Sequence, residues 1–86
     1  MEEESKIDVK QALRVFDRAT REGQKEADGW HYQGLTVSTD FDGYTVFINS
    51  DKVKLTVFFH NKFSVDYGSD RDLQDFNRLL ASLDQS

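Results

Sequence analysis

The stretch LTVSTDFDGYTVFI, residues 35–48, decides the fold because two alternating segments flank a turn dipeptide. Asp42-Gly43 favours a type I′ turn, in which both central residues have positive φ and the flanking strands pair antiparallel. A two-residue turn here sets the register of the hairpin and puts the paired apolar side chains on one face. The expected facing pairs are Phe41 with Tyr44 and Val37 with Ile48.

The sequence before this hairpin changes its parity at Gly34. Apolar residues on the two sides of Gly34 cannot all reach one face of an unbroken strand, because successive side chains alternate. Glycine is where a bulge forms most easily, so we expect one strand over about residues 30–39 with a bulge near Gly34. The residues of opposite parity are Trp30 and Tyr32 before the glycine, and Leu35 and Val37 after it.

Three more alternating segments follow, over about residues 44–49, 52–59 and 63–67, and short polar turns separate them. Chain reversals this short join neighbouring antiparallel strands. A turn between Ile48 and Val53 keeps the alternating apolar residues on the core face of the hairpin. The facing pairs would be Val46 with Leu55 and Tyr44 with Val57.

Apolar residues at helical spacing lie on both sides of these strands. Ser5 can cap a first helix over residues 5–22, and Gly23 is suited to end it. A second helix is expected over residues 70–83. The polar segment 24–29 has no periodicity and is expected to form a loop.

The expected architecture is an α+β fold of a single domain, residues 1–86, with residues 1–4 as a disordered acidic tail. The element order is α-β-β-β-β-α. Each helix has one apolar side and each strand has one dominant apolar face. The simplest way to bury these surfaces is a two-layer structure, with both helices on one face of a four-stranded antiparallel meander.

The opposite face of this sheet is expected to be polar except for Phe47 and Phe58. In the expected register Phe58 lies across from Gly43 and can cover its bare backbone. Phe47 lies across from Lys54, whose stem and ammonium can pack on the ring. The alternative is a patch of these two rings and Lys54 that binds a second copy or another protein.

A second candidate binding region contains Trp30, His31, Tyr32 and His60, at one end of the sheet. Rings and a histidine that converge on a pocket would suit a small ligand or a hydrolytic reaction, because histidine titrates near neutral pH. The alternative is that His31 points to solvent from a strand and that His60 is solvated in a turn. Local spacing fixes no carboxylate beside His60, and we assign no catalytic residue.

The composition restricts the classes of function. The chain has no cysteine and two histidines without a metal-ligand spacing, so we expect no disulfide, no metal site and no cofactor. A net charge of -5 and a pI near 4.8 disfavour nucleic acid as a partner. No apolar run approaches the roughly 20 residues of a membrane span. We therefore expect a cytoplasmic protein with neither nucleic acid nor a membrane as partner.

Two segments carry a resemblance to a known family: KQALRVFDRATREGQ, residues 10–24, and DGWHYQGLTVSTDFDGYTVFI, residues 28–48. They resemble a family of small uncharacterised proteins of gammaproteobacteria, and the likeness covers most of the chain. The resemblance implies a bacterial, cytoplasmic protein and brings no activity or site residues with it.

The residues themselves favour a non-enzymatic module that acts by contact with another protein, or with a second copy as a homodimer. The contact would use the outer sheet face around Phe47 and Phe58, or an edge strand. The alternative function is a small-molecule-binding or hydrolytic protein that uses the region of Trp30, His31, Tyr32 and His60.

Overall fold

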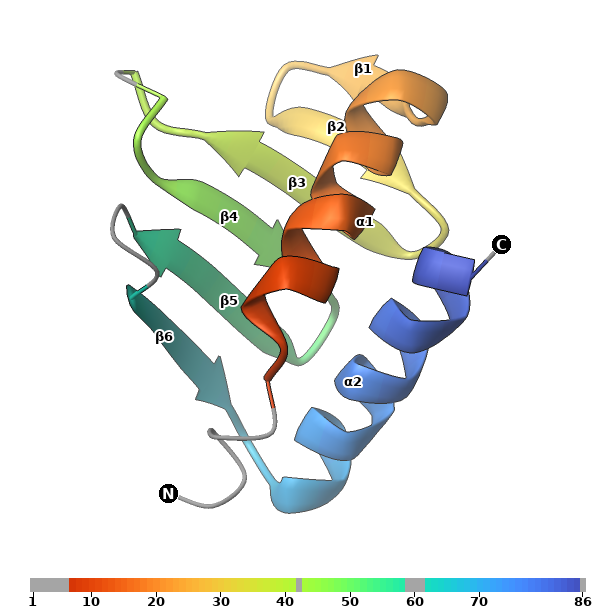
Figure 1. Ribbon diagram of the computed structural model, residues 1–86, viewed down its shortest axis with the longest axis vertical. Helices are drawn as coiled ribbons and strands as arrows, with labels where there is room; N and C mark the ends of the chain where they lie inside the picture. The colour runs from red at the N-terminus through yellow and green to blue at the C-terminus, as the bar shows by residue number, and fades with distance from the viewer. Residues whose placement is uncertain (1–6, 42, 59–61, 86) are drawn as a thin grey trace.

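The computed structural model describes residues 7–41, 43–58 and 62–85 and contains two helices packed on an antiparallel sheet (Figure 1). Both helices lie on the same face of the sheet. The predicted α+β class is therefore confirmed, whereas the predicted tail, residues 1–4, lies outside the described residues. The elements are α1 Val9–Glu22, β1 Gln24–Glu26, β2 Gly29–Tyr32, β3 Leu35–Thr39, β4 Val46–Asn49, β5 Val53–Phe58, β6 Lys62–Tyr67 and α2 Asp70–Gln85.

The sheet has six strands within the described residues, so the prediction of four strands is wrong. The strands lie in the order β1 to β6, and each pairs antiparallel with the next. One additional strand, β1, lies in the segment that was expected to be a loop. It pairs with β2 through a hairpin that places Gln24 opposite His31 and Glu26 opposite Gly29.

The second additional strand arises because the chain reverses at Gly34. Gln33 and Gly34 have φ values of 50° and 87°, the positive values that both central residues of a type I′ turn adopt. The predicted bulge is therefore wrong, and residues 30–39 form the two paired strands β2 and β3. The reversal brings residues of opposite parity to the same face, as the pairs Trp30–Val37 and Tyr32–Leu35.

The β3–β4 hairpin has the predicted register, with Val37 opposite Ile48. Its connection is held by Asp40, whose carboxylate accepts hydrogen bonds from the Gly43 and Thr45 backbone N–H groups at 2.7 and 3.3 Å. Asp42 lies outside the described residues. The strands end at residue 39 and begin again at residue 46, so the expected inward pair of Phe41 and Tyr44 is wrong: these side chains are 103% and 63% exposed.

The β4–β5 register differs by two residues from the prediction. The turn contains only Asp51 and Lys52, since Ser50 N–H donates to the Val53 carbonyl at 2.8 Å. A shift by two keeps each side chain on its predicted face, but it changes every partner. The predicted pairs Val46–Leu55, Tyr44–Val57, Phe47–Lys54 and Phe58–Gly43 are wrong, and the observed pairs are Val46–Val57, Phe47–Thr56, Ile48–Leu55 and Asn49–Lys54.

One hydrophobic core lies between the helices and the sheet. Both helices bury the apolar sides that their spacing predicted. Neither α1 nor α2 combines the length and the apolar character that crossing a membrane requires. The fully buried side chains are Ala12, Val15 and Ala19 of α1, Leu73, Phe76 and Leu80 of α2, and Leu35, Val37, Ile48, Val53 and Leu55 of the sheet.

Side chains fix the starts of both helices. Asp8 is the N-cap of α1, because its carboxylate accepts the Gln11 backbone N–H at 3.1 Å. The predicted cap, Ser5, lies outside the described residues. In α2 the Ser69 hydroxyl accepts the Asp72 N–H at 3.2 Å, which satisfies one of the unpaired donors of the first turn.

Candidate interaction surface

The face of the sheet away from the helices is mostly polar, and we call it the outer face. Residues that pair across a ladder share a face, and neighbours along a strand alternate, so the registers define its membership. His31 and Lys54 belong to it. The other members are Gln24, Glu26, Thr36, Ser38, Phe47, Asn49, Thr56, Phe58, Lys62, Ser64 and Asp66.

Phe47 and Phe58 lie diagonally across neighbouring strands of the outer face. Phe47 is half-buried opposite Thr56, and Phe58 follows two residues later on β5 and is 43% exposed. One position beyond the last β4–β5 pair, Phe58 faces Thr45. Diagonal neighbours are within reach of aromatic side chains, so the structure brings these two predicted residues together. Lys54 lies diagonal to Phe47 on its other side.

The strands β3 and β5 end, and β4 and β6 begin, at the same end of the sheet (Figure 1). Three large hydrophobic residues are exposed among those that the structure describes: Phe41, Tyr44 and Phe58. We call them the aromatic end. The sequence analysis missed Phe41 and Tyr44 as surface residues because it extended the strand alternation into the connection.

Strand alternation separates the members of the second candidate region. Trp30 and Tyr32 lie on the helix face and pack partly buried against the core, and Lys25 Nζ lies 4.8 Å from the centroid of the Trp30 ring. His31 lies on the outer face, where its Nε2 is 2.8 Å from Asp28 Oδ1. This hydrogen bond lowers the pKa of Asp28. His60 lies outside the described residues, so the structure does not bring the four residues together.

The hollows in the described surface are shallow, and few polar side chains converge on any one of them. One of about 350 Å³ lies beside the β1–β2 turn and is lined partly by Asp28 and Trp30. Another, of about 360 Å³, lies between α2 and two turns and is lined partly by Asp51, Asp72 and Asp75. No group of three or more His, Cys, Asp or Glu side chains within residues 7–41, 43–58 and 62–85 is placed to hold a metal ion.

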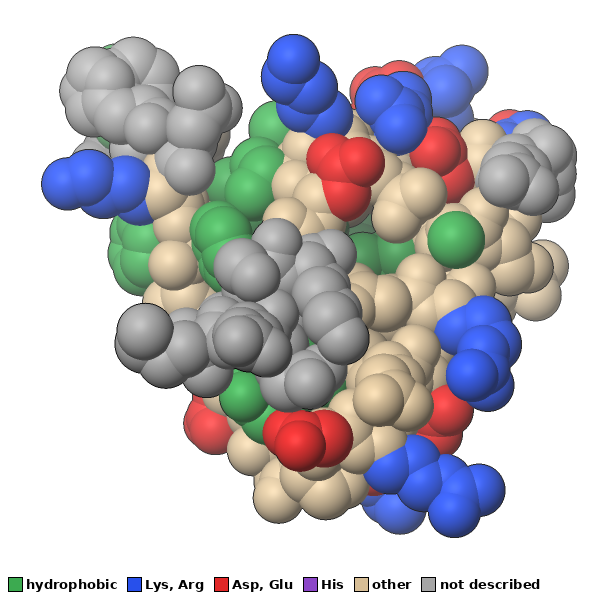
Figure 2. Space-filling view, turned by 60° about the horizontal axis from the view of Figure 1, so that its bottom comes forward, with side chains coloured by type: hydrophobic (Ala, Val, Ile, Leu, Met, Phe, Trp, Pro, Cys, Tyr) green, Lys and Arg blue, Asp and Glu red, His purple; other side chains and the backbone are tan. Residues whose placement is uncertain are grey.

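Charges of both signs are mixed on the face drawn in Figure 2. Basic and acidic side chains are interspersed there, and apolar side chains lie between them. A nucleic-acid backbone is recognised by a continuous basic stripe or patch. The described side chains on this face form no such stripe.

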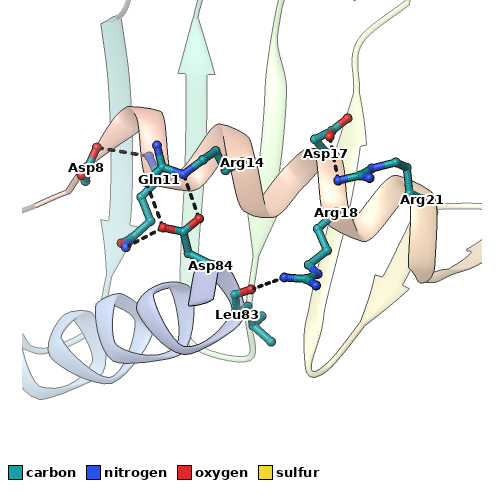
Figure 3. Close-up of polar contacts among 8 residues, drawn as sticks. All are labelled: Asp8, Gln11, Arg14, Asp17, Arg18, Arg21, Leu83 and Asp84. Carbon is teal, nitrogen blue, oxygen red and sulfur yellow. Dashed lines mark hydrogen bonds and ion pairs between the residues drawn. The ribbon is translucent and has the colours of Figure 1, made fainter. Parts of the chain in front are cut away.

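Arginines of α1 bind the last turn of α2 (Figure 3). Arg14 holds Asp84 through two contacts, Nε to Oδ1 at 2.8 Å and Nη2 to Oδ2 at 2.9 Å, and Gln11 Nε2 adds a third to Oδ2 at 3.4 Å. Arg18 Nη1 donates to the Leu83 carbonyl at 3.2 Å, which satisfies a terminal carbonyl of the helix. These groups therefore join the two helices.

The ion pair of Arg14 and Asp84 predicts a loss of stability in acid. The hydrogen bond from Arg14 lowers the pKa of Asp84 below its ordinary 3.8. The pair therefore stabilises the fold fully above that pH, and the stabilisation is lost as pH falls through the lowered pKa. We expect Asp84→Asn to reduce the difference between urea unfolding midpoints measured at about pH 6 and about pH 3.

A double-mutant cycle gives the control for this prediction. Arg14→Gln removes the same contact from the other side, so Arg14→Gln with Asp84→Asn should lose no more acid dependence than either change alone. An Asp84→Asn variant whose midpoint falls as steeply in acid as that of the unchanged protein would contradict the role of this pair.

Comparisons with known proteins show a match to one family of unknown function. The chain has no significant match among curated proteins or among solved structures. A family model described as "Protein of unknown function (DUF3081)" matches residues 7–86, which include every helix and strand above. The chain therefore belongs to the DUF3081 family of proteins of unknown function.

Proposed function

We propose that this protein is a non-enzymatic module of the bacterial cytoplasm that binds an apolar segment of another protein through its aromatic end. One observation carries the proposal: the exposed large hydrophobic side chains of the described chain gather at one end of the sheet. Aromatic residues are enriched in protein interfaces and supply most of the binding energy at their centres. The resemblance to a bacterial cytoplasmic family supports the location.

The surroundings of the aromatic end suit a protein partner better than a small ligand. Phe41 is fully exposed, and Phe58 is exposed on the outer face, so the rings line no enclosed cavity of the kind that small ligands need. Phe47 continues the apolar surface from Phe58. Polar side chains such as Thr56 and Ser38 lie beside Phe47 and can form the hydrated rim of an interface.

Site-specific photo-crosslinking tests the proposal. Benzoylphenylalanine in place of Phe58 or Phe41 should capture the same protein in cells of the native source, and the matched control is the same probe at Gln74, an exposed position on α2. The Tyr44→Ser change should lower capture roughly tenfold, because an interface aromatic is often worth more than 1 kcal/mol.

The proposal predicts capture at the aromatic end and not at the control position. Equal labelling from Gln74 and Phe58, or capture that Tyr44→Ser leaves unchanged, would show that the aromatic end is not a binding surface. Far-ultraviolet circular dichroism of each variant separates lost binding from lost folding.

A further inference from the structure

Among the described residues, no strand pairs with β6 on the side away from β5, so β6 is an edge strand of the sheet. It is last in the strand order, and Figure 1 shows it at the border of the sheet, away from β1. It has six residues, whereas the opposite edge strand, β1, has only three. A long edge strand presents a row of backbone groups that can pair with another chain, and very short edges prevent such pairing. The better template is therefore β6.

Hydrogen bonding within the sheet shows which backbone groups of β6 point outward. Ser50 N–H donates to the Val53 carbonyl, so Val53 points to β4, and the residues of β5 then alternate between β4 and β6. Lys54, Thr56 and Phe58 consequently point to β6, and their partners Asp66, Ser64 and Lys62 point back to β5. The N–H and C=O groups of Phe63 and Val65 are left on the outward side of the edge.

We propose that two copies of this chain pair antiparallel through β6, about a two-fold axis that passes through Ser64. The backbones of Phe63 in one copy and Val65 in the other then exchange two hydrogen bonds, and the symmetric pair exchanges two more. The helices of both copies lie on the same side of the joined sheet, because core-face residues of one copy lie opposite core-face residues of the other. The two sheets join into one continuous sheet.

The charges along β6 select this register. Lys62 of each copy lies opposite Asp66 of the other, twice in the dimer, at positions where cross-strand side chains come closest. Both are exposed in the single chain. On the helix side, the half-buried Phe63 lies opposite Val65, which extends the apolar layer across the seam.

Other registers of the two β6 strands lose the pairing of Lys62 with Asp66 or of Phe63 with Val65. A slip by one residue puts outer-face residues opposite core-face residues. A slip by two places Lys62 opposite Ser64 or Gly68 and removes both ion pairs. The net charge of -5 on each copy opposes association, so opposite charges at the seam are needed to offset it. The contact adds a partner, the second copy, and is independent of the proposed aromatic end.

Charge reversal tests the register. Lys62→Asp and Asp66→Lys each turn both ion pairs into like-charge pairs, so each should weaken the dimer roughly ten- to thirty-fold in sedimentation equilibrium. The combined variant, Lys62→Asp with Asp66→Lys, exchanges the charges and should restore dimerisation. Since all three variants change only exposed side chains, circular dichroism should show the same fold.

Amide hydrogen exchange tests the backbone contact separately. The Phe63 and Val65 amides should exchange slowly at high protein concentration and quickly at low concentration. The Ser64 and Asp66 amides, which bond to β5, serve as internal controls and should be protected at both. A strict monomer at every concentration, or a combined variant as weak as the single ones, would overturn the inference.

The proposal of binding through the aromatic end and the proposal of the β6 dimer can be refuted independently of each other. Phe41→Ser should leave the β6 dimer unchanged and should lower capture by the crosslinker at Phe58. If Phe41→Ser abolishes self-association and the charge reversals do not, the copies meet through the aromatic end and the β6 register is excluded.

Discussion

Replacing Leu55 with alanine is expected to destabilise the protein by about 3–4 kcal/mol, as typical for a fully buried leucine. Leu55 is 0% exposed and lies on β5 between Ile48 and Val65, so its neighbours are held by two ladders and cannot collapse into the cavity. A domain of this size has a total stability of about 5–10 kcal/mol. One truncation should therefore remove a third or more of that stability.

Two substitutions on the same strand serve as controls in urea unfolding followed by the fluorescence of Trp30. Leu55→Met keeps the side-chain volume and should cost less than about 1.5 kcal/mol. Thr56→Ala changes the next residue, which is half-exposed on the outer face, and should cost less than about 1 kcal/mol. A Leu55→Ala variant no less stable than Thr56→Ala would contradict the assignment of Leu55 to the core.

The same alternation that buries Leu55 explains which parts of the fold the sequence could predict. Both helices and the last four strands show clear periods, so their existence and the buried sides of the helices were predictable. The strand β1 was not, since Gln24–Glu26 is polar and exposed at every position and has no period. Glutamine rarely adopts positive φ, so Gln33-Gly34 did not indicate a turn.

The register between β4 and β5 shows a different limit. Turns of two or four residues both keep Ile48 and Leu55 on the core face, so alternation cannot distinguish them. The choice depends on local hydrogen bonds at Ser50, whose hydroxyl accepts the Val53 N–H at 3.3 Å. The difference of two residues in the register places Phe58 opposite Thr45 instead of Gly43. It therefore changes the interpretation of the candidate surface.

The candidate surface was predictable only in part. Alternation placed Phe47 and Phe58 correctly on the outer face, because both lie inside strands. It misplaced Phe41, since side-chain direction is not fixed beyond the end of a strand. The contact between Arg14 and Asp84 joins residues 70 positions apart, and the relative placement of two helices cannot be read from the charge pattern of either one.

The largest loss of stability from a change at a glycine is expected at Gly29. The backbone conformation there is one that residues with a side chain rarely adopt, and there is no space for a Cβ atom. Its φ is +131°, and an added Cβ would lie 2.2 Å from the Val37 carbonyl oxygen and 3.0 Å from Ser38 Cβ. Backbone strain costs about 1–3 kcal/mol and overpacking about 1–3 kcal/mol more. Gly29→Ala should therefore lose roughly 3–5 kcal/mol in urea unfolding.

The Gly34→Ala variant separates the contribution of backbone strain from that of overpacking. Gly34 also has positive φ, +87°, but no atom lies within 4 Å of its added Cβ, so only strain remains and the loss should be about 1–2 kcal/mol. The difference between the variants then measures the close approach of β2 to β3 at Gly29. Equal losses would mean that Val37 and Ser38 move aside easily. A larger loss for Gly29→Ala means that the contact fixes how the β1–β2 hairpin, absent from the predicted fold, is held against the rest of the sheet.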